Sequence, residues 1–305
     1  MATDEYDADD TEQTDLGVAH GNRHERQRRR EEAMAARPAT AAFEPSIECS
    51  KQEYAWLVQT LGGPYHDGVL ADVLYRVKGG KEATVYCCQA GASTGWGLVA
   101  AKIYRPAMHR TMRNDWVYRL GRQMTEGGGS GKSVRDARSL RAVANRSGHG
   151  KGLLRGSWIA HEFATMTKLH EAGVSLPRPL ENTGQTILME FIGARDRAAG
   201  TLHETSVAAR DAQRLFEQLV GDVGRMLWCD VIHADLSAHN VLYDGRRGWI
   251  IDFPQAVDPY QNPRALVLLV RDCTRLCQFF AALGVQADGT KLALDLWERY
   301  MRGRL

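Results

Sequence analysis

The order in which two hydrophobic patterns follow one another constrains the fold of this chain more than any other feature. Short β-branched and aromatic runs, which are typical of strands, come first, at residues 73–77, 84–88 and 98–104. Apolar residues then recur at the spacing of an amphipathic helix over 158–170 and 212–227. Strands followed by helices predict an α+β protein with two lobes.

Several residues indicate where these elements begin, turn and end. Ser157 is a suitable N-cap for the first helix, and Gly173 lies just beyond the end of that helix. The glycine-rich residues 91–97 predict a turn between two strands. Pro263 predicts the first position of a later helix, because its fixed φ suits a helix start. The two lobes are expected to join near residues 189–193.

The chain is expected to divide into three parts. Residues 1–45 predict a disordered charged tail, because they carry too little apolar surface to offset the entropy of ordering them. Residues 46–192 are expected to form the N-terminal lobe and residues 193–305 the C-terminal lobe. Within the first lobe, the glycine-rich and basic residues 125–152 predict a long flexible loop.

Composition excludes several classes of protein. The chain has 39 Lys and Arg against 37 Asp and Glu, so its overall charge favours no class of partner. No apolar run approaches the roughly 18 residues of a membrane span, and the acidic start is unlike a signal peptide. The six cysteines form no CxxC pattern, which excludes a disulfide framework and a zinc site. Cys273 and Cys277 are expected in the core. We therefore expect a cytoplasmic protein without a membrane segment.

The strongest chemical signal is His-Ala-Asp-Leu-Ser-Ala-His-Asn at 233–240, which is followed by Ile-Ile-Asp-Phe at 250–253. Phosphoryl transfer needs a carboxylate beside the attacking oxygen and oxygen ligands for Mg²⁺. Asp235 can supply the carboxylate, and Asn240 and Asp252 can supply the ligands. Asp and Asn also cap turns, but two such motifs in this order favour the chemical interpretation.

A second signal lies in the predicted strands. Lys102 interrupts the apolar run at 99–103, where an unpaired ammonium group would be costly to bury. Phosphates and a carboxylate of the next helix, with Glu162 as the candidate, would satisfy it; a lysine that reaches water from a strand edge is the alternative. The turn at 79–83 contains two glycines that could bring backbone amides close to phosphates, although adjacent glycines also occur in ordinary hairpins.

Together these motifs resemble the RIO kinase family, nearer its RIO1-like branch. The resemblance covers about residues 65–285, and its five motifs are Gly80-Lys-Glu-Ala, Val99-Ala-Ala-Lys-Ile-Tyr, Met189-Glu-Phe-Ile-Gly, His233-Ala-Asp-Leu-Ser-Ala-His-Asn and Ile251-Asp-Phe-Pro-Gln-Ala-Val. Ser237 and the Phe-Pro-Gln sequence distinguish the chain from common protein kinases and from aminoglycoside phosphotransferases. The resemblance implies a two-lobed protein-kinase-like fold of the compact RIO type, with a small β-rich N-lobe, a helical C-lobe and no activation segment.

The resemblance also implies a role for each candidate residue. Asp235 would be the catalytic aspartate, assisted by Lys102, while Asn240 and Asp252 would bind Mg²⁺, with Mn²⁺ as a substitute. The residues implied to bind ATP are Lys78, Gly79, Gly80, Lys81, Glu82, Ala83, Val85, Lys102, Glu162, Met189, Glu190 and Ile192. Among them, the turn would cover the triphosphate, Glu162 would pair with Lys102, and the backbone near Glu190 would meet adenine.

The function implied by the resemblance is an ATP- and Mg²⁺-dependent serine/threonine protein kinase that acts on a protein serine and on itself. Serines of the predicted loop that could accept phosphate are Ser130, Ser133, Ser139 and Ser147. An ATPase switch in ribosome maturation, with Asp252 as a transient phosphoryl acceptor, stays open. A small-molecule kinase of the aminoglycoside or choline type also stays open, although Ser237 and the absence of a long helical insertion argue against it.

The predicted loop suggests one further partner. Residues 132–155 contain seven Lys or Arg and one acid. A solvated loop explains this charge, and so does contact with RNA or the ribosome, for which the affinity would fall steeply with salt.

Overall fold

The computed structural model describes residues 42–80, 82–105 and 148–305 of the 305-residue chain, and within these ranges the side chains of Ser93 and residues 148–155 are not described. Almost all of the predicted tail (1–45) therefore lies outside the described residues. So do Lys81, most of the predicted flexible loop (125–152), and the four candidate serines of that loop.

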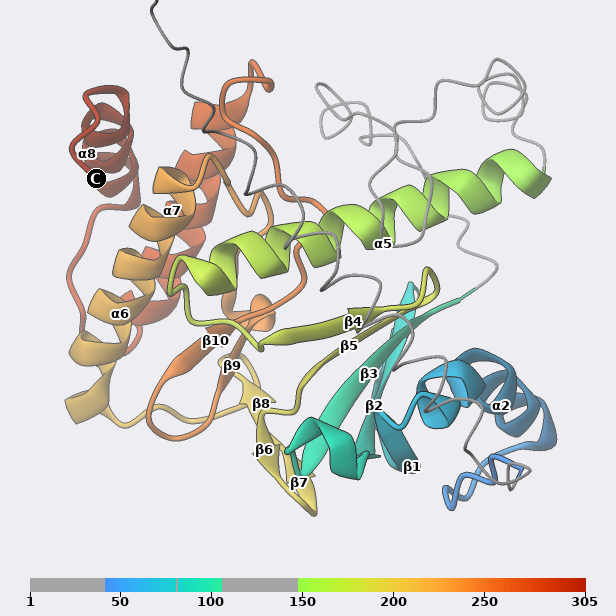
Figure 1. Cartoon of the computed structure of the whole chain (residues 1–305). Helices are drawn as coiled ribbons and strands as arrows, with labels where there is room; N and C mark the ends of the chain where they lie inside the picture. Colours follow the sequence, from blue (N-terminus) through green and yellow to red (C-terminus); the bar gives the residue numbers. More distant parts are fainter. Residues whose placement is uncertain (1–41, 81, 106–147) are drawn as a thin grey trace, which may run out of the picture. The chain divides into compact units, whose positions relative to one another are not determined.

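An antiparallel five-stranded sheet forms the first lobe, with strand order β1-β2-β3-β5-β4 (Figure 1). The strands are β1 (Leu70–Gly79), β2 (Ala83–Ala90), β3 (Leu98–Tyr104), β4 (Pro179–Asn182) and β5 (Thr186–Glu190), and the short helix η1 (Ala92–Thr94) connects β2 to β3. All three strands expected near the start of the chain are present, so the strand pattern is confirmed.

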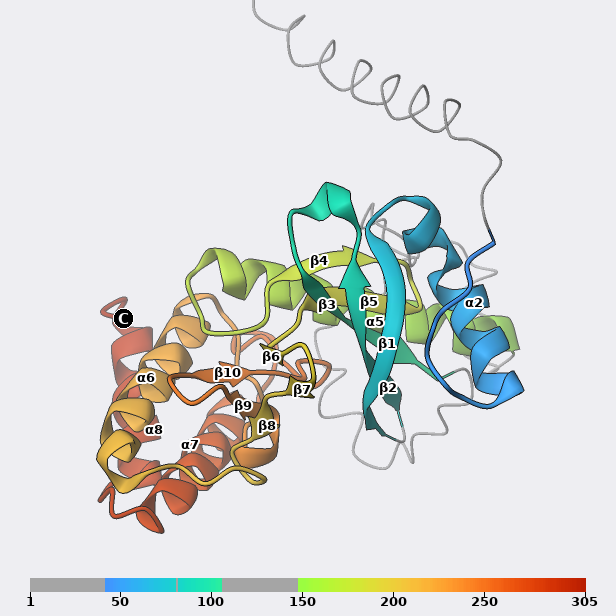
Figure 2. The same cartoon turned by 90° about the horizontal axis from the view of Figure 1, so that it is seen from below.

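Side chains alternate between the two faces of this sheet, as they must along a strand. On one face, Ala101 of β3 and Leu188 of β5 join the buried cluster of the helix α2 (Lys51–His66). On the other face, Ala100 and Ile187 join the cluster of the helix α5 (Gly148–Glu171). The sheet is therefore packed between two helices, and Figure 2 shows α2 beside β1.

Helix α2 was not predicted from the sequence pattern. Its last turn contains Gly62, Gly63 and Pro64, which are poor helix formers. Tertiary packing overrides this propensity, because Leu57 and Leu61 are fully buried against the sheet.

The predicted start of the next helix was wrong. Helix α5 begins at Gly148, so Ser157 lies inside it rather than capping it, and residues 148–152 are helical rather than part of a loop. Glycines at 148, 150 and 152 lower the helix propensity of this segment, so the sequence pattern did not predict that the helix begins here. The predicted end is confirmed, since α5 ends at Glu171 and Gly173 has a positive φ of 78°.

Three helices and a small sheet form the second lobe. The helices are α6 (Ala209–Trp228), α7 (Ala265–Ala281) and α8 (Gly289–Met301), and the strands β8 (Gly200–Thr201), β9 (Val241–Tyr243) and β10 (Gly248–Ile250) pair in the order β10-β9-β8. The hairpin of β6 (Gly193–Ala194) and β7 (Arg197–Ala198) follows β5, and the short helix η2 (Ala238–Asn240) precedes β9. The helix expected over 212–227 is thus confirmed.

Helix α7 carries much of the core of this lobe. Its Phe280 packs edge-on against Phe216 of α6, with ring centroids 5.4 Å apart. Cys273 and Cys277 are buried in the same core, as expected. Pro263 was expected to open this helix, but α7 begins two residues later because the Asn262 side chain accepts the amide of Arg264 in a turn.

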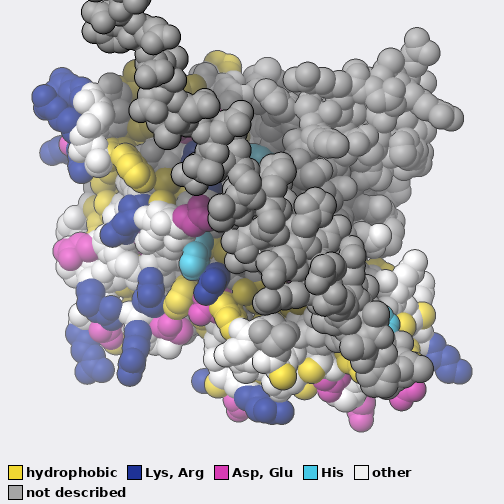
Figure 3. Space-filling model, viewed as in Figure 1, with side chains coloured by type: hydrophobic (Ala, Val, Ile, Leu, Met, Phe, Trp, Pro, Cys, Tyr) yellow, Lys and Arg dark blue, Asp and Glu magenta, His cyan; other side chains and the backbone are white. Residues whose placement is uncertain are grey.

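On the face shown in Figure 3, Lys and Arg side chains gather over the N-terminal part of α6 and the turn between β9 and β10. Arg210 and Arg214 there are exposed and lie near Asp211. Since acids alternate with these basic side chains, this region is an ordinary solvated surface. Among the described helices, none is both long and apolar enough to span a membrane.

Candidate functional site

Lys102 is the centre of an ion-pair cluster that joins the two lobes. Its Nζ lies 2.7 Å from Oε1 of Glu162 on α5 and 2.8 Å from Oδ1 of Asp252, which follows β10. The side chain of Lys102 is only 12% exposed and that of Glu162 only 1%, whereas that of Asp252 is 45% exposed. The ammonium group is therefore paired inside the molecule and does not reach water as that of a strand-edge lysine would.

Burial and charge act in opposite directions on this cluster. Burial alone would lower the pKa of Lys102, but Asp252 and Glu162 outweigh it and raise that pKa above its ordinary value. Burial raises the pKa of Glu162, and Lys102 offsets only part of this increase. The ammonium of Lys102 thus stays charged at neutral pH.

Tyr104 also holds Glu162, a contact that was not predicted. Its hydroxyl donates to Oε2 of Glu162, and the backbone amide of Phe253 donates to the same carboxylate. The sequence contained a signal for this contact, because Tyr104 comes two positions after Lys102 and therefore faces the same side of β3. Glu162 is held by groups from both lobes.

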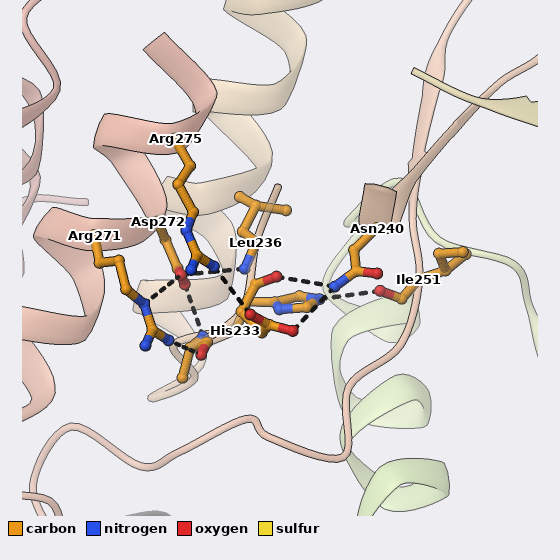
Figure 4. A network of polar contacts seen from close by, with 9 residues as sticks. His233, Leu236, Asn240, Ile251, Arg271, Asp272 and Arg275 are labelled. Atoms are coloured by element: carbon orange, nitrogen blue, oxygen red, sulfur yellow. Dashed lines mark hydrogen bonds and ion pairs between the residues drawn. The ribbon is translucent and has the colours of Figure 1, made fainter. Parts of the chain in front are cut away.

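Asp235 and Asn240 lie in the loop between α6 and β9, and Figure 4 shows Asn240 within the network of polar contacts there. Asn240 Nδ2 donates to the backbone oxygen of Asp235 at 2.9 Å and lies 3.5 Å from its Oδ2. Arg275 of α7 approaches the other carboxylate oxygen, with its Nη1 3.0 Å from Oδ1. These residues line a pocket of about 510 Å³, whose full lining is Asp235, Ser237, Ala238, His239, Asn240, Arg275 and Gln278.

A buried aspartate of α7 fixes the backbone on both sides of Asp235. Asp272 accepts the amide of Ala234 at 2.7 Å and that of Leu236 at 3.1 Å, while Arg271 donates to the oxygen of Ala234 (Figure 4). Ala234 has a φ of 61°, a conformation that costs about 1–2 kcal/mol for an L-residue. The contacts from α7 hold this loop in its strained shape.

None of the α7 residues at the site was predicted. Arg271, Asp272 and Arg275 are the charged residues of a mostly apolar helix, and a buried charged residue such as Asp272 seldom lacks a partner. These charges were a usable signal, although they do not reveal which loop supplies the partners.

The loop of Asp235 also contacts the segment that carries Asp252. His233 Nε2 lies 3.0 Å from the Ile251 oxygen, and the amide of Ile251 donates to the Asn240 oxygen at 2.9 Å. Burial lowers the pKa of His233, which favours its neutral ring. Asp252 has a φ of 72°, a conformation uncommon outside glycine. These contacts hold Asn240 next to the segment of Asp252.

The glycine-rich turn joins β1 to β2, beside the strand of Lys102. The Gly80 amide donates to the Ala83 oxygen at 2.9 Å, and a Cβ at Gly80 would lie 3.1 Å from that oxygen. Val85 pairs with Lys102 across the sheet.

The residues on either side of the turn also have partners. Before the turn, Lys78 Nζ lies 3.6 Å from Glu204 Oε1 of the second lobe, and both side chains are more than half exposed. After the turn, the Glu82 oxygen accepts the amide of Arg105.

The junction between the lobes contains the remaining candidates. Met189 is buried at 8% exposure and pairs with Ala100 of β3. The amide of Glu190 donates to the Arg178 oxygen at 2.8 Å, and the Ile192 oxygen accepts the amide of Ala199 at 2.9 Å. These two backbone groups are therefore engaged within the protein.

The protonation of Asp272 gives a test of this arrangement. Burial raises its pKa to about 7, well above the ordinary aspartate value of about 4. Between pH 4 and 7 Asp272 keeps its proton in the folded protein but has lost it in the unfolded chain. The stabilisation that the protonated Asp272 contributes is therefore lost as the pH rises from 4 to 7. Relative to an Asp272→Asn variant, the free energy of unfolding of the wild type should fall by about 1 kcal/mol per pH unit over this range.

Urea unfolding of both proteins at pH 5, 6, 7 and 8 measures this difference. An Asp295→Asn variant is the control, because Asp295 is an exposed residue of α8 that is 3.8 Å from Arg299. Parallel curves for the wild type and Asp272→Asn would contradict the raised pKa.

The model of the RIO domain family matches residues 132–292. The RIO-type serine/threonine-protein kinase Rio1 of Haloferax volcanii is 30% identical over 213 residues, which are 70% of this chain and 64% of that protein. The serine/threonine-protein kinase RIO1 of Caenorhabditis elegans is 34% identical over 129 residues, which are 42% of this chain and 25% of that protein. The chain thus spans only part of the length of the curated relatives that it matches.

A solved structure of the Rio2 kinase from Chaetomium thermophilum, an ADP/Mg²⁺-phosphoaspartate complex, has a TM-score of 0.51 at 18% identity. The similarity covers 85% of this chain and 80% of that one. At this identity it shows the fold alone, and the fold is the expected two-lobed, protein-kinase-like one.

The family match covers more than half of the chain and includes the loop of Asp235, Asp252 and the whole of α7. The relatives named above are RIO1 proteins. The protein belongs to the RIO domain family, in its RIO1-like branch.

Proposed function

We propose that the protein is an ATP- and Mg²⁺-dependent serine/threonine protein kinase of the RIO type. The observation that carries this proposal is the buried Lys102, paired with both Glu162 and Asp252 beside the loop of Asp235. A single ammonium group held between carboxylates of two lobes suits the neutralisation of phosphate charge. The kinase names of the relatives support the same function.

The polar groups at the site fit a magnesium-bound nucleotide. Asp252 offers a half-exposed carboxylate, and Asn240 uses its Nδ2 for Asp235, so that its amide oxygen is the atom suited to a metal. Carboxylate and amide oxygens are the ligands of Mg²⁺, and Mn²⁺ accepts them too. The metal would neutralise charge on the phosphates.

We place the nucleotide between the turn at 78–83 and the junction of the lobes. The turn's backbone amides would cover the triphosphate, and Lys102 would contact the α- and β-phosphates. Since the Glu190 amide and the Ile192 oxygen are engaged within the protein, the adenine contacts fall to the Glu190 oxygen and the Ile192 amide. Met189 and Val85 would border the base.

Asp235 then acts on the acceptor hydroxyl. Its carboxylate orients the hydroxyl and takes the proton as the oxygen attacks the γ-phosphorus. A bond forms between that oxygen and phosphorus, the bond to the β–γ bridging oxygen breaks, and ADP leaves. Asn240 and Asp272 keep the loop in place through their contacts on either side of Asp235.

A protein serine, including the chain's own, is the proposed acceptor. The relatives named as protein kinases favour neither an ATPase switch nor a small-molecule kinase. The RNA or ribosome contact stays a prediction, because most of residues 132–155 lie outside the described part of the chain. A cytoplasmic location likewise stays a prediction from the sequence.

Incubation with γ-labelled ATP tests this function. We expect label on protein in the presence of Mg²⁺ or Mn²⁺ and none in excess EDTA, with little label released as free phosphate. Release of nearly all label as phosphate would instead favour the ATPase switch. Label that appears only on added aminoglycoside or choline would favour the small-molecule kinase.

A further inference from the structure

The pocket beside Asp235 has a charge distribution that bears on the choice of acceptor. Among its lining residues, Asp235 is the single carboxylate, and Arg275 supplies a full positive charge. His239 is a third ionisable lining residue, and its ring contacts that of His203 with centroids 4.0 Å apart and planes tilted by 42°. Apart from the reacting carboxylate, the described wall of this pocket offers no negative group to a basic acceptor.

Arg275 differs from its neighbour on the same face of α7. Arg271, one helical turn earlier, donates to the backbone oxygen of Ala234 and lies 4.0 Å from Asp272, so it supports the loop. Arg275 instead contacts the Asp235 side chain, at 3.0 Å, and is 41% exposed (Figure 4). Its guanidinium group thus lies on the pocket side of the loop, where an acceptor must arrive.

Binding of an acceptor at Asp235 would change the partners of this arginine. In the protein alone, Arg275 contacts one carboxylate oxygen of Asp235, and Asn240 lies 3.5 Å from the other. An acceptor hydroxyl that bonds to Oδ1 of Asp235 would compete with Arg275 for that oxygen. The guanidinium group then faces the residues that flank the hydroxyl, and a carboxylate there replaces the lost partner through a charge-assisted hydrogen bond.

On the basis of the kinase function proposed above, we infer that Arg275 selects acceptors in which acidic residues flank the reacting serine or threonine. Aspartate or glutamate next to the hydroxyl meets Arg275, whereas lysine or arginine there is repelled by it. Such specificity arises because an acidic acceptor gains an ion pair with Arg275, whereas a basic acceptor meets a like charge.

Three peptides that differ only in the residues beside one serine test this inference. The flanking residues are aspartate, alanine or lysine, and kcat/KM is measured for each peptide. We expect the wild type to prefer the aspartate peptide over the lysine peptide by a factor of about 5 or more, since one partly exposed ion pair is gained and one repulsion is avoided. Arg275→Gln should bring the ratio close to one, and Arg275→Glu should invert it.

A matched control and a folding control keep the test specific. Arg299 lies on α8 within 3.8 Å of Asp295, so Arg299→Gln removes the same charge and should leave the peptide ratio unchanged. Thermal unfolding of Arg275→Gln should match that of the wild type, because this side chain is partly exposed.

The outcomes separate this inference from the proposed function. A wild type that labels all three peptides equally, or an Arg275→Gln variant that loses kcat for all three and keeps the ratio, overturns the acidic preference alone. The second result would assign Arg275 to the orientation of Asp235 or to the transferring phosphoryl group. A wild type that releases phosphate but labels no peptide and no protein overturns both proposals.

Discussion

An Asp235→Asn variant is expected to transfer phosphate to protein about 10²–10⁴ times more slowly than the wild type, the range that a positioned proton acceptor contributes. Asparagine has nearly the same shape as aspartate but cannot take the hydroxyl proton. The Asn240 side chain should stay in place, because its 2.9 Å hydrogen bond goes to the backbone oxygen of residue 235. The loss should therefore appear in the chemical step and not in nucleotide binding.

Single-turnover transfer of γ-label, with nucleotide affinity measured separately by titration, checks this expectation. Asp295→Asn makes the same chemical change at an exposed position of α8 and should transfer phosphate at the wild-type rate. An Asp235→Asn variant with an unchanged transfer rate would move the role of proton acceptor to another group. An equal loss in ATP affinity and in rate would indicate that the substitution disturbed the loop.

Much of the candidate site could be predicted because its signals are local. The three candidate residues of the phosphoryl-transfer motifs lie within 18 residues of sequence, at Asp235, Asn240 and Asp252. Lys102 is identified as a lone charge within an apolar strand. The strands of the first lobe and the helix α6 were similarly apparent from their hydrophobic periods.

The parts that the sequence did not predict depend on contacts between distant segments. Asp272 bonds to backbone groups 36 and 38 positions earlier, and Arg275 contacts Asp235 from 40 positions away. A hydrophobic pattern can place both residues on α7, but it cannot show which loop lies against them. Helix α2 escaped prediction for a related reason, since packing on the sheet outweighs the weak propensity of its last turn.

The buried cluster around Lys102 combines both kinds of information. Lys102 could be identified in its strand, and Glu162 could be proposed from the face of its helix. The hydroxyl of Tyr104 lies on the same side of the strand as Lys102, which was a usable signal. The amide of Phe253, which also bonds to Glu162, could not be deduced without the fold. This cluster ties the lobes together, so its loss should affect stability as well as phosphoryl transfer.

A Lys102→Met variant is expected to lose ATP-dependent labelling and to be destabilised by about 3–5 kcal/mol, the cost of removing one partner from a buried ion pair. Methionine fills a similar volume, but it leaves Glu162, which is 1% exposed, without its counter-ion. The loss of the Lys102 charge raises the pKa of Glu162 further, so this carboxyl group binds a proton and avoids the cost of an unpaired buried charge.

The pH dependence of this variant follows from that proton. A carboxyl group with a raised pKa in the folded state stabilises the protein at low pH, and this stabilisation is lost as the pH rises through its folded pKa. The free energy of unfolding of Lys102→Met should therefore fall more steeply between pH 5 and 8 than that of the wild type. Urea unfolding across this range measures the difference, and an equal slope for the two proteins would contradict it.

A Lys102→Met/Glu162→Gln double variant separates stability from chemistry. Removing these two charges leaves no unpaired charge on Glu162, while Asp252, which is 45% exposed, can be hydrated. Tyr104 can still donate its hydroxyl to the glutamine oxygen. The double variant should thus regain most of the lost stability, since a buried ion pair contributes little net free energy relative to neutral groups of similar volume. It should not regain labelling, because no ammonium group faces the phosphates. Recovery of labelling together with stability would show that Lys102 serves only to hold the lobes together, and the proposed contact with the nucleotide would then have to be abandoned.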